Sequence, residues 1–221
     1  MPSKIQSSID AALADINDGA TVMIGGFGLA GQPQELIDGL IRRGSKNLTI
    51  VNNNAGNGEV GLALLIKSGY VKKVICSFPR QADSHHFDEA YRAGRIELEV
   101  VPQGNLAERI RAAGAGIGGF FTPTGYGTLL AECKETRTID GKNYVLESPI
   151  HADFALIKAH RADALGNLTY RKTARNFGPV MATAAKTTIV QVSEIVEVGE
   201  LDPESVITPG IFVNRIVEVS A

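Results

Sequence analysis

The sequence has no tryptophan and only two cysteines among its 221 residues. Cys76 and Cys133 lie far apart, and neither has a histidine beside it that could activate a thiol. Isolated cysteines of this kind are most often reduced and behave as small hydrophobic residues. We therefore expect no disulfide and no catalytic thiol.

The chain also lacks a large excess of charge and any long apolar run. Its formal net charge is −2 and its pI is about 6.1, so it has no basic surface of the kind that binds nucleic acid. No apolar stretch approaches the roughly 20 residues that span a bilayer. The N-terminal segment "MPSKIQSSIDAALADINDGA" has no apolar core and carries acidic residues. We expect a cytoplasmic protein that binds neither nucleic acid nor membrane.

What the chain does have is a 44% hydrophobic content and 24 glycines, above the usual share of about 7%. The segment 34–43 shows the clearest periodicity, because its aliphatic residues fall on one helical face and its charged residues on the other. Pro33 suits the first helical position, and Gly44 suits the end of the helix. The pattern predicts a helix over 34–43.

The same alternation continues through the first 120 residues. Strands are predicted at 21–27, 48–51, 72–78 and 96–101, and further helices at about 59–67, 83–93 and 106–113. Repeated strand–helix units joined by short loops predict a mostly parallel, doubly wound α/β sheet with helices on both faces.

The second half predicts a more strand-rich region. Asp140-Gly141 stands between two strand-like arms and is a strong β-hairpin signal. "ADFALIKAH" and "TTIVQV" are typical of buried strands, with a helix predicted at about 176–185 between them. With no low-complexity linker and no internal repeat, we expect 1–221 to form one domain with a C-terminal hairpin and strand region.

The stretch "TVMIGGFGLAGQPQELIDGL" contains a Gly-x-Gly-x-x-Gly run at Gly26, Gly28 and Gly31. In a dinucleotide-binding fold, an acidic residue about 20 positions later holds the ribose. That place is occupied here by 52–54, three asparagines, and the nearest acid is Glu59 on the next predicted helix. An NAD-dependent oxidoreductase is therefore disfavoured, while a glycine corner without a ligand stays open.

The wider spacing around the run is more specific. Asp18-Gly19, an apolar triplet, Gly25-Gly26-Phe27, Gly31 and Pro33 stand in fixed register. This pattern resembles the signature of the alpha subunit of the family I CoA-transferases. "VPQGNLAERIRAAGAGIGGFFTPTGYGT", "LGNLTYRKTARNF" and "GELDPESVITPGIFV" are similar to further family segments in the expected order, so the resemblance covers nearly the whole chain.

The resemblance implies that CoA moves from an acyl-CoA to a free carboxylate through a glutamyl thioester, an instance of covalent catalysis. In the family this glutamate lies in a Ser-Glu-Asn-Gly motif on the beta subunit. The nearest string here, Ser193-Glu194-Ile195, lacks the Asn-Gly. Glu35 and Glu59 stand at predicted helix starts, where carboxylates are common. We therefore expect half of an active site, completed by a beta subunit in a heterodimer or α2β2 assembly, with coenzyme A as part of the substrate and no permanent cofactor.

Within that resemblance, Gln103 is implied as the donor to the oxyanion of the reacting thioester, and the corner from Gly25 to Gly31 as the CoA-binding segment. The segment comprises Gly25, Gly26, Phe27, Gly28, Leu29, Ala30 and Gly31. From the residues alone, Gln103 follows a strand at the edge where open α/β sheets bind ligands, although it could equally satisfy loop backbone. Asn105 and Glu108 are predicted to cap the next helix.

Three further groups are candidates for substrate contacts. Among the three asparagines, Asn53 is expected to contact substrate and the other two to serve turns. Arg80, at the exit of the third strand, is expected to hold the distal carboxylate of a dicarboxylate acceptor, with Arg109 and Arg111 as alternatives. The basic run at Arg171, Lys172 and Arg175 could meet CoA phosphates or be plain surface.

No metal is expected. His85 and His86 are adjacent and do not share a helix face, and no acidic ligand stands at zinc spacing. His151 and His160 flank a predicted strand and form no ligand pair.

"SFPRQAD" and "HADFALIKAH" are more similar to the branch of the family that acts on 3-oxoadipate with succinyl-CoA as donor than to the acetate and acetoacetate branch. The succinyl-CoA:3-oxoacid branch is a nearer alternative. A regulator on a related α/β fold is the non-enzymatic one. A partner subunit would need apolar surface, for which "AGAGIGGFFTPTGYGTLL" and "PGIFV" are candidates.

Overall fold

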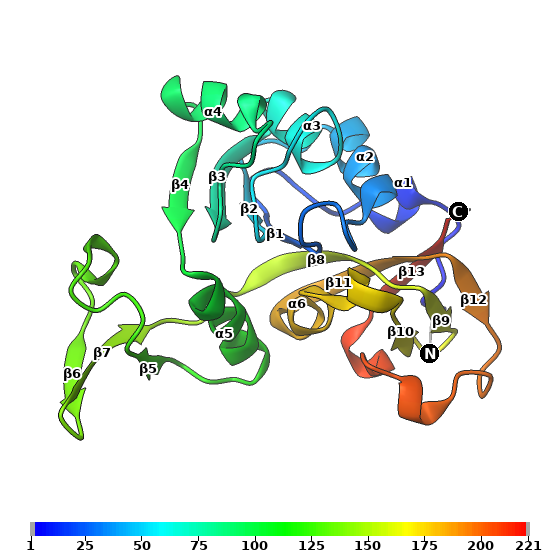
Figure 1. The fold of residues 1–221 in the computed structure, drawn as a ribbon. Helices are drawn as coiled ribbons and strands as arrows, with labels where there is room; N and C mark the ends of the chain where they lie inside the picture. Colours follow the sequence, from blue (N-terminus) through cyan, green and yellow to red (C-terminus); the bar gives the residue numbers. More distant parts are fainter. Residues whose placement is uncertain (1–2, 220–221) are drawn as a thin grey trace.

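A seven-stranded parallel sheet forms the centre of the molecule, in a computed structural model that describes residues 3–219 (Figure 1). The strand order is β13-β11-β8-β1-β2-β3-β4. These strands are β1 (Thr21–Ile24), β2 (Leu48–Val51), β3 (Val71–Cys76), β4 (Glu97–Val100), β8 (Ala152–Lys158), β11 (Ala185–Val192) and β13 (Arg215–Glu218).

The path of the chain through this sheet confirms the doubly wound prediction. From β1 at the centre, the chain moves outward through β2 and β3 to β4, and then returns to place β8 on the opposite side of β1. Val22 pairs with Ile50 on one side and with Phe154 on the other. The direction of winding therefore reverses between β1 and β8, and the carboxyl ends of these two strands border the crevice where ligands bind in open α/β sheets.

In the described part of the chain, residues 3–219, six α-helices cover both faces of the sheet (Figure 1). One face carries α1 to α4, and the other carries α5 and α6. Their bounds are α1 (Ile9–Ala12), α2 (Gln34–Arg43), α3 (Leu62–Lys67), α4 (His85–Arg92), α5 (Gln103–Gly114) and α6 (Gly178–Ala184).

Each face has its own hydrophobic core, and β1 contributes to both. Val22 and Ile24 pack in the core beneath α1–α4, while Met23 between them packs in the core beneath α5 and α6. Successive side chains of a strand point to opposite faces, so a strand buried on both sides must be apolar at every position. This explains why the three fully buried residues of β1, Val22 to Ile24, form a continuous apolar run.

Helix α2 has the bounds that its periodicity predicts. Its C-cap, Gly44, adopts the left-handed conformation with φ of 75°, which glycine takes without the steric cost of a Cβ. Pro33 stands one position before the helix, at the N-cap, rather than at the first helical residue. The predicted starts of α3 and α5 were less accurate. These helices were predicted to begin at about residues 59 and 106, and they begin at Leu62 and Gln103.

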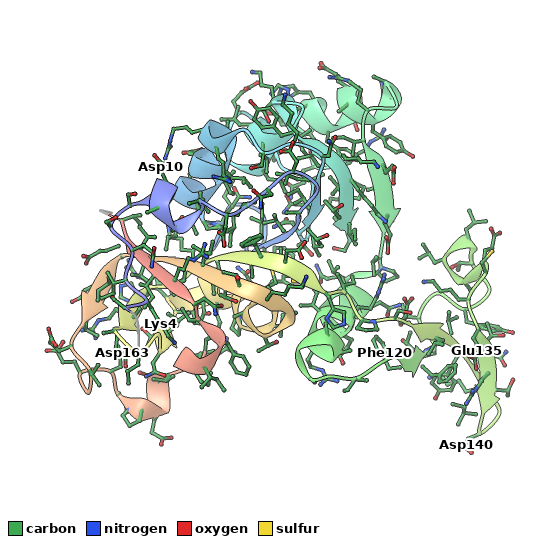
Figure 2. All side chains as sticks on the ribbon, turned by 180° about the vertical axis from the view of Figure 1, so that it is seen from behind. Lys4, Asp10, Phe120, Glu135, Asp140 and Asp163 are labelled. Atoms are coloured by element: carbon green, nitrogen blue, oxygen red, sulfur yellow. The ribbon has the colours of Figure 1, made fainter. Side chains whose placement is uncertain are left out.

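A three-stranded antiparallel sheet extends away from the main body as an arm (Figures 1 and 2). It comprises β5 (Phe120–Thr122), β6 (Thr136–Ile139) and β7 (Lys142–Glu147), with the 3-10 turn η1 (Leu129–Ala131) before β6. Asp140 and Gly141 form its tip with φ of 50° and 73°, the positive values that a tight hairpin turn requires. The predicted hairpin is therefore confirmed.

The base of the arm is fastened by a buried carboxylate. Glu147 is only 3% exposed, and its oxygens lie 2.9 Å from Lys134 Nζ and 3.7 Å from Arg109 Nε. The same carboxylate accepts a 3.2 Å hydrogen bond from Asn105 Nδ2. Asn105 thus lies inside α5 and helps to anchor the arm, so its predicted role as the helix cap was wrong. Glu108, its predicted capping partner, pairs with Arg111 instead.

A second small sheet lies under β8 and β11 near the C-terminal end of the chain (Figures 1 and 2). Its order is β10-β9-β12, from β9 (Arg161–Asp163), β10 (Leu168–Thr169) and β12 (Glu194–Val196). The 3-10 turns η2 (Lys172–Arg175), η3 (Pro203–Ser205) and η4 (Gly210–Phe212) complete the structure.

Asp15 and Arg215 join the first helix region to the last strand. The two pairs of guanidinium and carboxylate atoms lie 2.6 and 2.7 Å apart, and hydrogen bonding from Arg215 lowers the pKa of Asp15. A lowered folded-state pKa stabilises the protein above the unfolded-state pKa, and this stability is lost as the pH falls through the folded-state value.

We expect Asp15→Asn to lower the free energy of unfolding by at most about 1 kcal/mol at neutral pH, because the Asp15 side chain is 52% exposed and solvent screens the pair. Below about pH 4, the free energy of unfolding of the variant should also depend less on pH than that of the native protein. Urea unfolding at neutral and acidic pH measures both effects. Asp10→Asn, which breaks a single 3.0 Å contact with Arg42, is the matched control; an equal loss in both variants would contradict the assignment.

Candidate functional site

The glycine corner follows β1 at the point where the winding of the sheet reverses. Phe27 and Ala30 exchange two backbone hydrogen bonds of 3.0 and 3.2 Å, which close a tight turn. Gly28 lies inside this turn with φ of 61°. The turn presents two large apolar side chains to solvent, since Phe27 is 51% exposed and Leu29 is 62% exposed. The corner is therefore a turn with an apolar tip.

The corner is held against a segment that is distant in sequence. A Cβ on Gly31 would lie 2.2 Å from the carbonyl oxygen of Ala174, so only glycine fits there. Asn176 fixes the two ends of the turn: its Oδ1 accepts a hydrogen bond from Gly26 N, and its Nδ2 donates to Ala30 O at 2.9 Å. The corner and residues 172–176 thus form one unit.

The start of α2 is not open to a phosphate in the way that a dinucleotide-binding loop requires. Leu36 N donates to Gln191 Oε1 at 3.2 Å, and Gln191 Nε2 donates to the carboxylate of Glu35. A phosphate at a helix N-terminus needs free N–H groups there and is opposed by a resident carboxylate. In this protein the Gly-x-Gly-x-x-Gly run therefore forms a tight turn held against residues 172–176, and it does not form a phosphate-binding loop as in NAD-binding folds.

Gln103 is the first residue of α5 and faces the glycine corner. Its Nε2 donates to Asn53 Oδ1 at 2.8 Å, and Ser77 Oγ donates to the same oxygen at 2.8 Å. A carboxamide nitrogen has two N–H groups, so the bond to Asn53 leaves a second donor. Gln103 and Phe27 line a hollow of about 340 Å³, together with Gly104, Ala107, Asn176, Phe177 and Val180. The second N–H of Gln103 is available to a ligand in this hollow.

The three asparagines after β2 have different roles. Asn52 and Asn54 are buried and form local turns: Asn52 Oδ1 accepts from Asn54 N, and Asn54 Oδ1 accepts from Gly56 N. These contacts support the interpretation of two of the three as turn residues. Asn53 lies next to Gln103, but it is only 3% exposed and its carboxamide oxygen already accepts two hydrogen bonds. This geometry favours a role in orienting Gln103.

A second, basic pocket of about 500 Å³ lies at the end of β8, on the other side of the corner. Its lining combines the cations Lys158, Arg171 and Lys172 with the imidazole of His160, and the pocket also contains Tyr170, Ser193, Ala30, Ala159, Thr173 and Ala174. Within residues 3–219, none of Lys158, Arg171 and Lys172 has a carboxylate within 4.0 Å. The pocket is therefore suited to an anion.

Sequence reasoning singled out Arg171 and Lys172 but missed Lys158 and His160. Only part of the information needed to place Lys158 and His160 in this pocket is present in the sequence. Lys158 and His160 stand at the end of the strand "ADFALIKAH", but the sequence does not reveal that this strand lies beside β1. The burial of Tyr170, which raises its pKa to about 12, shows how closely this wall of the pocket is packed.

Arg80 lies outside both pockets. Its Nε contacts Asp88 Oδ1 at 2.6 Å, and its side chain is 56% exposed. The alternatives are engaged elsewhere, since Arg109 contacts Glu99 at 2.9 Å and Arg111 contacts Glu108 at 2.9 Å. The structure thus does not bring any of these arginines to the hollow beside Gln103.

The two cysteines have different environments. Cys76 is fully buried, and burial raises its pKa to about 12, as befits an unreactive thiol. Cys133 is exposed, so it does not contribute to the core as a small hydrophobic residue would. Both are free thiols.

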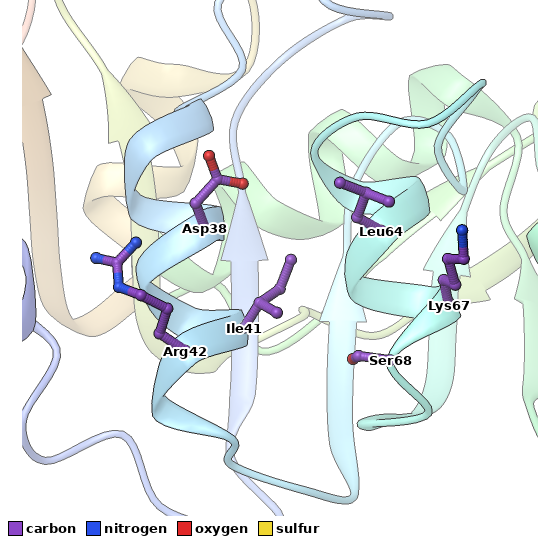
Figure 3. A pocket seen from close by; sticks show the side chains of 6 residues that line it. All are labelled: Asp38, Ile41, Arg42, Leu64, Lys67 and Ser68. Carbon is purple, nitrogen blue, oxygen red and sulfur yellow. The ribbon is translucent and has the colours of Figure 1, made fainter.

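Another hollow, of about 370 Å³, lies between α2 and α3 (Figure 3). Ile41 of α2 and Leu64 of α3 face each other across it, with Asp38, Arg42, Lys67 and Ser68 at its margin. It lies in the helical layer, away from the strand ends, and we assign it no role.

None of the helices within residues 3–219 has the length and apolarity of a transmembrane span.

The parallel sheet and the reversal beside β1 define a doubly wound α/β protein, with polar side chains at the edge where such sheets bind ligands. The family model for coenzyme A transferases matches residues 6–219, and the chain belongs to this family. The Rossmann oxidoreductase and regulator hypotheses are thereby superseded.

Curated relatives identify the kind of subunit. The chain is 70% identical over 220 residues to the alpha subunit of the 3-oxoadipate CoA-transferase of Pseudomonas putida, covering 100% of this chain and 95% of the relative. It is 50% identical over 214 residues to the alpha subunit of a probable succinyl-CoA:3-ketoacid coenzyme A transferase of Bacillus subtilis, covering 97% and 89%. The chain is thus similar to alpha subunits of such transferases over its whole length.

Solved structures share the fold. An acyl-CoA transferase of Escherichia coli O157:H7, in a thioester complex with CoA, matches with a TM-score of 0.85 at 24% identity, over 98% of this chain and 47% of that chain. Glutaconate coenzyme A-transferase of Acidaminococcus fermentans matches with a TM-score of 0.83 at 22% identity, over 99% and 76%. At this identity the likeness establishes the α/β fold alone.

Proposed function

We propose that this chain is the alpha subunit of a heteromeric 3-oxoacid CoA-transferase that moves CoA from succinyl-CoA to 3-oxoadipate. The identities of 70% and 68% to two subunits named for 3-oxoadipate support this acceptor. Relatives named for succinyl-CoA:3-ketoacid transfer reach 45–50%, which makes acetoacetate the second candidate. We further propose that 1–221 acts as a single domain in the cytoplasm, without a permanently bound cofactor.

The observation that carries this proposal is the orientation of Gln103 by Asn53. When a thioester or anhydride carbonyl is attacked, its oxygen gains negative charge, and a fixed N–H donor stabilises that charge. Gln103 donates one N–H to Asn53 and lines the hollow beside the glycine corner, and the proposed oxyanion donor is its second N–H. A donor already held in place needs little reorganisation as the charge develops.

The nucleophile is proposed to come from a beta subunit. The candidate glutamates of this chain are engaged: Glu194 lies 2.8 Å from Arg161, Glu35 accepts from Gln191, and Glu59 contacts two histidines. The human mitochondrial relative supports a second half-site, because this chain corresponds to only 43% of its length. The apolar surface for such a partner includes Leu129 and Ile211, which are 81% and 82% exposed.

The two pockets suggest which part of CoA binds on each side of the glycine corner. We assign the phosphates of CoA to the basic pocket at Lys158, Arg171 and Lys172, because cations without acidic partners suit a phosphate. The thioester is assigned to the hollow at Gln103. The exposed side chains of Phe27 and Leu29, between the two pockets, would face the pantetheine arm.

The test is a CoA-exchange assay between succinyl-CoA and each of 3-oxoadipate and acetoacetate. We expect turnover only when the chain is co-expressed with a beta subunit that carries a Ser-Glu-Asn-Gly motif, with 3-oxoadipate preferred. The control is the same partner with the glutamate of that motif changed to alanine. Turnover by this chain alone, or a borohydride-sensitive adduct formed on it, would contradict the shared site; preference for acetoacetate would contradict the acceptor only.

A further inference from the structure

Three potential metal ligands meet at one point: Glu59, from the loop before α3, and His85 and His86, from the first turn of α4. Glu59 Oε1 lies 3.1 Å from His85 Nε2 and 2.8 Å from His86 Nε2. The three donor atoms all lie within 4.8 Å of one another. Although His85 and His86 are adjacent, they occupy the first turn of α4, and Glu59 reaches both rings from the segment before α3. The expectation of no metal, which considered only spacing along the sequence, did not include this convergence.

Both ring nitrogens of His85 face carboxylates. Nδ1 lies 3.1 Å from Asp83 Oδ1, and Nε2 lies 3.1 Å from Glu59 Oε1. The same Glu59 oxygen lies 2.8 Å from His86 Nε2, so one carboxylate oxygen is presented to both histidines while Asp83 holds the far side of the His85 ring.

We propose that Glu59, His85 and His86 bind a divalent transition-metal ion, with Zn²⁺ the best match. Two imidazole nitrogens and one carboxylate oxygen form a recognised open zinc ligand set, which leaves a fourth position for water. Zn–N and Zn–O bonds of about 2.0–2.2 Å place tetrahedral donors about 3.3–3.5 Å apart. The pairs at 2.8 and 3.1 Å need to open by only a few tenths of an ångström.

The surroundings of the three ligands fit this role. Asp83 acts on His85 as the carboxylate that orients a metal-binding imidazole, and such outer partners commonly fix the tautomer. Lys67 Nζ contacts the other oxygen of Glu59, Oε2, at 2.9 Å, so Oε1 is the oxygen that faces the two histidines. The positive end of the α4 dipole opposes a cation here, and the negative charges of Glu59 and Asp83 offset it.

The ligands stand on loops that are already tied together. Asp83 N donates to Asn57 Oδ1 at 2.9 Å, Gly58 N donates to Asp83 O at 2.8 Å, and Ser84 Oγ donates to Gly56 O at 2.9 Å. These bonds hold the segment after β2 against the segment after β3. A metal would therefore fasten together the two segments that also carry Asn53 and Arg80.

The experiment is a Zn²⁺ titration of the full-length chain by isothermal titration calorimetry after treatment with a chelator, repeated with Co²⁺ followed by absorbance. We expect one equivalent per chain, release of protons on binding, and weaker binding at acidic pH. His86→Asn and Glu59→Gln should each weaken binding more than the roughly 10- to 100-fold expected for Asp83→Asn, which removes only the outer partner. His151→Asn is the matched control, since this exposed histidine lies outside the cluster.

Circular dichroism of each variant separates loss of the site from loss of the fold, and Asp83→Asn provides a graded second readout. Absence of binding to the native chain, or equal affinity in His86→Asn and His151→Asn, would overturn the proposal. The titration needs neither the beta subunit nor turnover, so its outcome is independent of the proposed CoA transfer.

Discussion

Replacing Gln103 by alanine is expected to lower kcat of the assembled enzyme by about 100- to 1,000-fold, the usual cost of removing one oxyanion donor. The expectation rests on the 2.8 Å bond from Gln103 Nε2 to Asn53 Oδ1, which holds the carboxamide in place, and on the position of Gln103 in the wall of the hollow beside Phe27. Gln103 is exposed at the first position of α5, so its truncation leaves both hydrophobic cores intact. The measurement is CoA exchange by the chain with its beta subunit.

Two variants make this experiment specific. Gln103→Glu keeps the size of the side chain but replaces donors with a carboxylate that repels an oxyanion, so it should be at least as impaired. Gln6→Ala is the matched control, because the Gln6 side chain donates to Lys4 O near the N-terminus, while its backbone bond to Ile216 O is kept in the variant. Turnover in Gln103→Ala equal to that of the control would remove Gln103 from the mechanism. Size-exclusion chromatography checks that assembly with the partner is retained.

Replacing Gly31 by alanine is expected to cause the largest loss of stability of the variants considered, about 2–5 kcal/mol in the free energy of unfolding. Two effects add. The φ of 73° lies in the left-handed region that disfavours a Cβ, and the new Cβ would lie 2.2 Å from Ala174 O, a backbone atom that cannot rotate away. Urea unfolding monitored by circular dichroism measures the loss.

Gly28→Ala is the matched control for this variant. Its φ of 61° is also left-handed, but a Cβ there meets nothing within 4 Å. We expect Gly28→Ala to cost only the conformational part, about 1–2 kcal/mol. Equal losses in Gly28→Ala and Gly31→Ala would show that the contact with residues 172–176 does not constrain the corner.

Much of the secondary structure could be predicted because it depends on local patterns. The amphipathic period of 34–43 and the turn residues Asp140-Gly141 specify α2 and the β6–β7 hairpin through neighbours within a few positions. The start of α5 was missed for the opposite reason. Asn105 has the side chain of a cap, but it is buried against Glu147, 42 residues later, where it helps to anchor the arm.

The candidate site shows the same division. Gln103 could be identified from the sequence, because the family resemblance and its place after a strand both point to it. The role of Asn53 as the partner of Gln103, 50 residues away, and the contribution of Lys158 and His160 to the basic pocket could not. The convergence of Glu59 on His85 and His86 was missed because it spans 26 and 27 residues.

The sequence by itself determined the family, the α/β class, the chain's need for glycine at its first corner, and the lack of a Ser-Glu-Asn-Gly motif. Each of these depends on residue types and short spacings, which a linear chain displays directly. Only the tertiary structure decided which loops meet: β8 inserts beside β1, and the segments after β2 and β3 lie against each other. Strand order sets these contacts, and it arises from the packing of the whole sheet, so no local pattern encodes it.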